Sequence, residues 1–119
     1  MKKKITSPEY MRVISTLRKA SNSANVVIWD VVAETLEKSK HRRLAINVSR
    51  VNRNSEEGET ILVPGKVLGS GSLDHKISIA AVDFSEEAKE KIEKAGGECL
   101  TIQTLIQRNS KGSGVKIIG

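Results

Sequence analysis

The sequence predicts an α/β (α+β) domain in which two helices come first and short strands then alternate with helices. Three observations lead to this class: helical spacing of apolar residues early in the chain, short β-branched runs later on, and an acidic-start, glycine-ended segment between two such runs. With 119 residues, 38% hydrophobic and 29% charged, the chain has the size and composition of one globular domain, 1–119. We divide it into a helical part (1–38), a basic segment (38–57) and an α/β core (58–119).

The helical part is predicted to hold two helices. Residues 7–21 have Ser7 at the N-cap position and Pro8 in the first turn, followed by one apolar face at helical spacing. Residues 26–38 are dense in β-branched side chains, which favours a strand, but their acidic residues recur at helical spacing and indicate a second helix. Its expected apolar stripe is Ile28, Val31, Val32 and Leu36.

The core is predicted to open with two strands joined by a glycine loop. TILV (60–63) is typical of a short strand, which we expect to end at Pro64 and Gly65. The glycine loop, PGKVLGSGSLDHK (64–76), follows, and KISIAAVDF (76–84) predicts a longer strand.

The rest of the core predicts one more helix, a strand, a helical turn and a last strand. SEEAKEKIEKAGG (85–97) has Ser85 as its N-cap, glutamates in the first turn and Gly96 where a left-handed stop is expected. The three later segments are ECLTI (98–102), TLIQRN (104–109) and GVKIIG (114–119).

The first sixteen residues of the basic segment, 38–53, contain the whole net charge of the chain. KSKHRRLAINVSRVNR (38–53) has six Lys or Arg and no Asp or Glu, whereas the rest of the chain is balanced, with 14 residues of each sign. A solvated helix face normally mixes the two signs, and an unmixed cluster repels itself unless a polyanion neutralises it. The segment therefore predicts a surface that binds a polyanion.

Nucleic acid is the polyanion that fits this segment best. Membrane binding would need an amphipathic helix with bulky apolar residues opposite the charge, and LAINV is too short for that. Arginines bind phosphates through paired hydrogen bonds, and the interleaved Asn and Ser side chains commonly bind sugar and phosphate oxygens. The three aromatic residues fall at expected core positions, so we expect recognition of folded RNA or duplex by charge and shape rather than by base stacking. A helix-turn-helix DNA-binding module over residues 26–53 stays open, although its glycine turn is not evident.

The glycine loop raises a second alternative, a nucleotide-dependent or hydrolytic enzyme that uses residues 65–76. A P-loop needs lysine after its last glycine and then a helix, whereas here Lys66 follows the first glycine and a strand comes next. Residue types of a hydrolytic triad occur at Ser70, Ser72, Asp74 and His75. Residues so close in sequence rarely converge on a substrate, and one cysteine with two histidines does not make a metal site. We therefore expect no enzymatic activity, cofactor, metal or small-molecule substrate.

A set of linked motifs resembles a known family. Between residues 65 and 97 lie KVLGSGSL, ISIAAVDFS and the spacing of Ala88, Ile92 and Gly96. RRLAINVSRVNR, VPGKVLG, LDHK and KGSGVKIIG add to them in order, so that the motifs cover nearly the whole chain. The chain resembles the ribosomal protein eighteen-e family of the archaeal and eukaryotic large subunit, a relative of bacterial large-subunit protein fifteen. Its compact length is closer to the archaeal members.

The resemblance implies a structural component of the large ribosomal subunit, bound to ribosomal RNA and next to other ribosomal proteins in the cytoplasm. It also implies a core wound as an irregular β-β-α superhelix behind an N-terminal helical part. The sequence has neither the apolar run of a signal peptide nor one long enough to span a membrane, so we expect no membrane partner. The residues expected to contact RNA are Lys38, Lys40, His41, Arg42, Arg43, Asn47, Ser49, Arg50, Asn52, Arg53, Lys66, Lys76 and Lys111.

Overall fold

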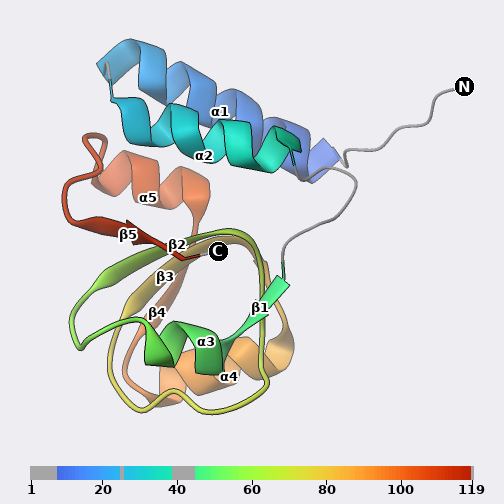
Figure 1. Ribbon diagram of the computed structural model, residues 1–119, viewed down its shortest axis with the longest axis vertical. Coiled ribbons are helices and arrows are strands. Elements are labelled where there is room, and N and C mark those ends of the chain that lie inside the picture. The colour runs from blue at the N-terminus through green and yellow to red at the C-terminus, as the bar shows by residue number, and fades with distance from the viewer. Residues whose placement is uncertain (1–7, 25, 39–44, 119) are drawn as a thin grey trace, which may run out of the picture.

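The chain folds as a parallel sheet covered by helices on both faces. The computed structural model describes residues 8–24, 26–38 and 45–118. In chain order the elements are α1 (Pro8–Ala24), α2 (Val27–Lys38), β1 (Ala45–Asn47), α3 (Val48–Arg53), β2 (Thr60–Leu68), β3 (Ser78–Phe84), α4 (Glu86–Lys94), β4 (Glu98–Thr101), α5 (Ile102–Arg108) and β5 (Val115–Ile117). Figure 1 shows α1, α2 and α5 on one side of the sheet and α3 and α4 on the other. The predicted α/β class is confirmed.

The strands lie in the order β1-β2-β3-β4, and all pairs are parallel. One edge of β2 serves two partners, because residues 60–62 pair with β5 and residues 66–68 pair with β1. Between these two stretches the register with β3 shifts. β2 therefore pairs with β1, β3 and β5, whereas β4 joins the sheet through β3.

The prediction that this strand ends at Pro64 and Gly65 is wrong. β2 continues through both residues to Leu68, with its register shift between Val63 and Lys66. Proline has no N–H for a strand ladder and is tolerated where the ladder is irregular. The Pro-Gly pair therefore marks the place where the partner of β2 changes from β5 to β1.

Alternate residues of the central strands belong to two separate cores. Leu62 and Ala80 belong to the cluster covered by α1, α2 and α5, whereas Ile61 and Ile79 belong to the cluster covered by α3 and α4. All four are completely buried. Because both faces are covered, both sets of alternate residues must be apolar, as is typical of parallel sheets.

α1 and α2 form a hairpin over the first of these cores. Arg18 of α1 lies between Asp30 and Glu37 of α2, and hydrogen bonds to these carboxylates raise the pKa of the guanidinium. Both predicted helices are confirmed, but the predicted apolar stripe of α2 is partly wrong, because Val31 is 45% exposed. The buried face is Trp29, Val32, Ala33 and Leu36. The tryptophan occupies the core position because its ring also meets the loop after α5.

Replacing Trp29 with phenylalanine tests this junction. The side chain is fully buried, and its Nε1 donates a hydrogen bond to the Ser110 carbonyl oxygen at 2.7 Å. Trp29→Phe keeps an aromatic ring but removes the donor, so we expect the free energy of unfolding to fall by about 1–2 kcal/mol. Urea denaturation followed by far-UV circular dichroism measures this change. An unaltered unfolding midpoint would show that the bond contributes nothing.

The other predicted elements of the core are confirmed. The Ser85 hydroxyl accepts a hydrogen bond from the Ala88 N–H at 3.1 Å, and Gly96 has a φ of +86°, so α4 begins and stops as expected. ECLTI, TLIQRN and GVKIIG correspond to β4, α5 and β5. The sequence did not reveal β1 and α3, which have three and six residues and are too short to show a period.

Candidate nucleic-acid interface

The connection from β2 to β3 brings the glycine loop onto the basic segment. Consecutive parallel strands need a connection that returns along the length of the sheet. Residues 69–77, which we call the crossover loop, make this return without a helix. Figure 1 shows the crossover loop passing α3 and α4 on its way. β2, β3 and α4 thus follow one another in the β-β-α order that the resemblance implied.

Two of the side chains predicted to contact RNA hold the crossover loop. Asn47 Oδ1 accepts a hydrogen bond from the Ser70 N–H at 3.1 Å, and Asn52 Oδ1 accepts one from the Asp74 N–H at 3.2 Å. The Ser49 N–H donates to the Ser70 carbonyl oxygen at 3.3 Å. The basic segment and the glycine loop, predicted as separate sites, are therefore one surface, and the two asparagines have a structural role in it.

The crossover loop approaches α3 and α4 so closely that its glycines have no room for a side chain. A Cβ atom on Gly71 would lie 2.3 Å from Ser49 Cβ, and one on Gly69 would lie 2.6 Å from Glu87 Cβ. From α4, Lys91 Nζ donates to the carbonyl oxygens of Gly69 and Gly71 at 2.5 and 2.6 Å. This role of Lys91 could not be predicted, because its spacing from Glu87 is that of an ordinary helical ion pair.

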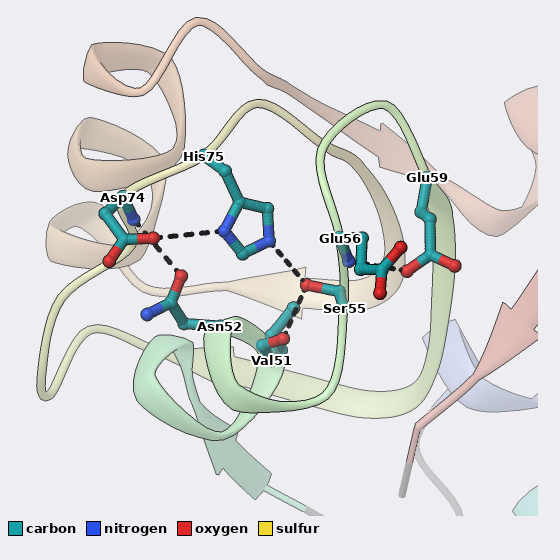
Figure 2. A network of polar contacts seen from close by, with 7 residues as sticks. All are labelled: Val51, Asn52, Ser55, Glu56, Glu59, Asp74 and His75. Carbon is teal, nitrogen blue, oxygen red and sulfur yellow. Dashed lines mark hydrogen bonds and ion pairs between the residues drawn. The ribbon is translucent and has the colours of Figure 1, made fainter.

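A chain of polar contacts fixes the far end of the crossover loop (Figure 2). His75 Nδ1 lies 3.1 Å from Asp74 Oδ1, and His75 Nε2 lies 2.9 Å from Ser55 Oγ. The residue types are those of a hydrolytic triad, completed by a serine outside the loop that the sequence did not single out. The Ser55 hydroxyl, however, donates to the Val51 carbonyl oxygen of α3 at 2.6 Å. The network therefore clamps the loop to the end of α3.

Protonation of the Asp74 carboxylate in acid should weaken this network of polar contacts. Hydrogen bonds to His75 and then to Asn52 hold the pKa of the Asp74 carboxyl below its ordinary value of 3.8. A carboxyl with a lowered folded-state pKa stabilises the fold above 3.8, and this contribution is lost as the pH falls through the lower folded value. Asp74→Asn should therefore lower the urea midpoint near neutral pH, with the difference disappearing in acid. A difference that persists unchanged in acid would contradict this role.

Arg50 and Arg53 lie on the outer face of α3. Val48 and Val51 are completely buried and turn the opposite face of the helix to the core, which leaves both arginines exposed. Lys76 is also exposed, at the end of the crossover loop beside Gly96. Arg50, Arg53 and Lys76 are therefore all exposed to solvent.

Two more of the predicted cations belong neither to α3 nor to the crossover loop. Lys66 belongs to β2, and its Nζ lies 3.9 Å from Asp83 Oδ2 on β3. Lys111 lies in the loop after α5, next to the Ser110 carbonyl group that binds Trp29, on the other side of the sheet from α3. The structure thus gives Lys66 an acidic partner and separates Lys111 from α3.

Part of the predicted set lies outside the described residues. Lys40, His41, Arg42 and Arg43 all belong to this part, as does the side chain of Lys38, the last residue of α2.

The aromatic residues of the chain are all engaged in the cores. Trp29 is fully buried, and Tyr10 and Phe84 pack half-buried against the two clusters. None of the rings is thus offered as an exposed platform on which bases could stack, in agreement with the sequence prediction.

Comparison with known proteins assigns the chain to a family. Residues 3–119 match the family described as ribosomal protein 60S L18 and 50S L18e. The chain belongs to this family. It is 48% identical over 113 residues to the large ribosomal subunit protein eL18 of Methanothermobacter thermautotrophicus, with 95% of the chain and 93% of that relative covered. It is 49% identical over 115 residues to the protein of the same name from Methanosphaerula palustris, with 97% and 95% covered.

The resemblance to the eighteen-e family drawn from the sequence motifs is therefore confirmed, and both relatives are archaeal proteins. In this member of the L18e family, the motif KVLGSGSL forms the end of β2 and the start of the crossover loop. One of the motifs that carry the resemblance therefore packs against α3.

Three further findings on this L18e chain concern metal ligands, the cysteine and membrane-crossing helices. Within residues 8–24, 26–38 and 45–118, no group of three or more His, Cys, Asp or Glu side chains could hold a metal ion. Burial, with Glu93 nearby, raises the pKa of the Cys99 thiol to about 11, so the thiol stays protonated at neutral pH. No helix in the described part is long and apolar enough to cross a membrane.

Proposed function

We propose that this chain is a non-enzymatic structural component of the large ribosomal subunit that binds folded ribosomal RNA through phosphate contacts. The names of its relatives support the ribosomal role, and the concentration of the net charge of +6 in residues 38–53 supports a polyanion as the partner. The observation that carries the proposal is the outer face of α3, which presents Arg50 and Arg53 beside a crossover loop already fixed in place. Neighbouring ribosomal proteins would be its other partners.

The geometry favours reading of the RNA backbone rather than of its bases. The guanidinium group of arginine binds a phosphate through two hydrogen bonds. A loop that is rigid before binding, as the crossover loop is, loses less conformational entropy when it binds. The exposed residues at the start of the crossover loop, Ser70, Gly71 and Ser72, have small side chains that let a phosphate chain come close. The cations of residues 38–43, together with Lys76, would extend the same surface.

The two rival functions have less support. In the helix-turn-helix alternative two helices would flank a short turn, but strand β1 comes between α2 and α3. In the nucleotide-binding alternative main-chain N–H groups would cradle phosphates. Here the carbonyl groups of Gly69 and Gly71 face Lys91 instead, and residues 65–68 are part of a strand.

Sedimentation of the tagged protein from a lysate of its own cells tests the proposal. Through sucrose gradients at low salt, we expect the protein to migrate with the large ribosomal subunit, and at high salt we expect its release, because phosphate contacts are screened. A protein that stays with small soluble material even at low salt would overturn the proposed function, while its family would be unaffected.

A further inference from the structure

A cavity of about 220 Å³ lies between the end of α3 and β5. Arg50 and Asn54 line it from α3 and from its C-cap, and Lys116, Ile117 and Ile118 line it from β5 and the residue after it. The cavity therefore lies where the basic segment meets β5.

Ile117 and Ile118 form the apolar wall of the cavity, and Ile117 is the one of the two that is exposed. Ile118 is only 6% exposed and belongs to the core under α3, and its N–H donates to the Leu62 carbonyl oxygen at 3.1 Å. Ile117 beside it is 40% exposed. A large aliphatic side chain at the mouth of a polar cavity offers a surface for the flat face of a ligand.

Two cations stand at the rim of the cavity. Arg50 comes from the basic segment, and Lys116 comes from β5. Lys116 Nζ lies 3.9 Å from Glu59 Oε1, at the outer limit of an ion pair, while the same carboxylate oxygen accepts the Glu56 N–H at 2.7 Å. Because Glu59 is held mainly by its own loop, Lys116 can turn to an anion in the cavity.

Asn54 provides a fixed hydrogen-bond acceptor. Its N–H donates to the Val51 carbonyl oxygen at 3.2 Å, and its Nδ2 donates to the Arg50 carbonyl oxygen at 2.8 Å. These bonds hold the side chain in place. Oδ1 is then the atom of this side chain that has no hydrogen bond in the described part of the chain.

We infer that this cavity binds one unstacked nucleotide of the RNA. The phosphate contacts Arg50 and Lys116, the base lies against Ile117, and the exocyclic amino group of adenine or cytosine donates to Asn54 Oδ1. Proteins commonly recognise such splayed bases by their edges. The inference rests on the proposed function, since Arg50 belongs to the surface that binds the RNA.

Nuclear magnetic resonance of the full chain labelled with nitrogen-15 tests the inference. The probes are AMP, CMP, UMP and inorganic phosphate at matched ionic strength. AMP and CMP should shift the amide signals of Asn54, Lys116 and Ile117 more than UMP does, because uracil has a carbonyl group where cytosine has its amino group. Equal shifts from all four probes would reduce the site to general charge attraction, and an absence of shifts would remove it; either result overturns the inference.

Matched variants locate the anion. Lys116→Gln should weaken AMP binding by about fivefold, and Glu59→Gln, which removes a competing charge but keeps an acceptor for the Glu56 N–H, should strengthen it by about threefold. Lys111→Gln, with the same loss of charge on the other side of the sheet, should change nothing. A hexapeptide of glutamate that shifts the same signals and displaces AMP at lower concentration would make the cavity a protein-docking site and overturn the inference.

Comparing the binding of AMP with the binding of large-subunit RNA separates this inference from the proposed function. If AMP fails to bind while the full chain still binds large-subunit RNA with a steep salt dependence, the cavity is wrong and the proposed function stands. If the RNA itself fails to bind at low salt, the proposed function fails.

Discussion

Replacing Gly71 with alanine is expected to lower the free energy of unfolding by about 3 kcal/mol. Two effects add up at this position. The new Cβ would lie 2.3 Å from Ser49 Cβ, so either the crossover loop or α3 must move. The backbone also has a φ of +89°, which an alanine rarely adopts. Urea denaturation, with circular dichroism as the signal, measures the loss.

Two other glycines separate the steric effect from the backbone effect. Gly58 and Gly114 have φ values of +87° and +72°, but nothing lies within 4 Å of a Cβ built on either. Gly58→Ala and Gly114→Ala should therefore cost only about 1 kcal/mol each. If Gly71→Ala costs no more than these controls, the close packing of the crossover loop on α3 is refuted.

Replacing both Arg50 and Arg53 with alanine is expected to flatten the salt dependence of RNA binding. Each phosphate contact contributes about 0.7–0.9 units to the slope of log affinity against log salt, so two contacts should remove about 1.5 units. The fall in affinity should be largest at low salt. Binding of large-subunit ribosomal RNA, measured by filter retention over a series of potassium chloride concentrations, gives the slope directly.

A pair of cations on α1 provides the control for this double variant. Arg12 and Lys19 are exposed, and their replacement by alanine removes the same charge from a face on the other side of the sheet. We expect the slope to stay unchanged there. If the α1 variant flattens the slope as much as the α3 variant does, binding depends on net charge alone, and α3 loses its special place.

Local signals in the sequence were enough for much of the fold. α4 could be predicted because Ser85 and Gly96 act on residues within one helical turn of themselves. β3 could be predicted because a strand buried on both faces is an unbroken apolar run. α2 could be predicted as a helix, but its orientation was missed, because the deciding contact joins Trp29 to a residue 81 positions away.

The arrangement of the interface could not be predicted for the same reason. The bonds that tie the crossover loop to α3 and α4 join residues 20 or more positions apart, such as Asn47 with Ser70 and Lys91 with Gly69. Residue type alone identified Asn47 as polar and available, whereas the fold uses its oxygen internally. The continuation of β2 through Pro64 could not be predicted either, because it depends on the pairing of β2 with β5 before this residue and with β1 after it.

The shared edge of β2 has a consequence for how the chain matures during its own synthesis. Half of that edge stays bare until β5 has been made, and the core under α1 and α2 lacks α5 until the same late stage. Until then the apolar face that α1 and α2 turn to the sheet lacks part of its cover. Exposed strand edges and apolar surfaces of this kind favour aggregation. We therefore expect the nascent chain to be most prone to aggregation before β5 has been made.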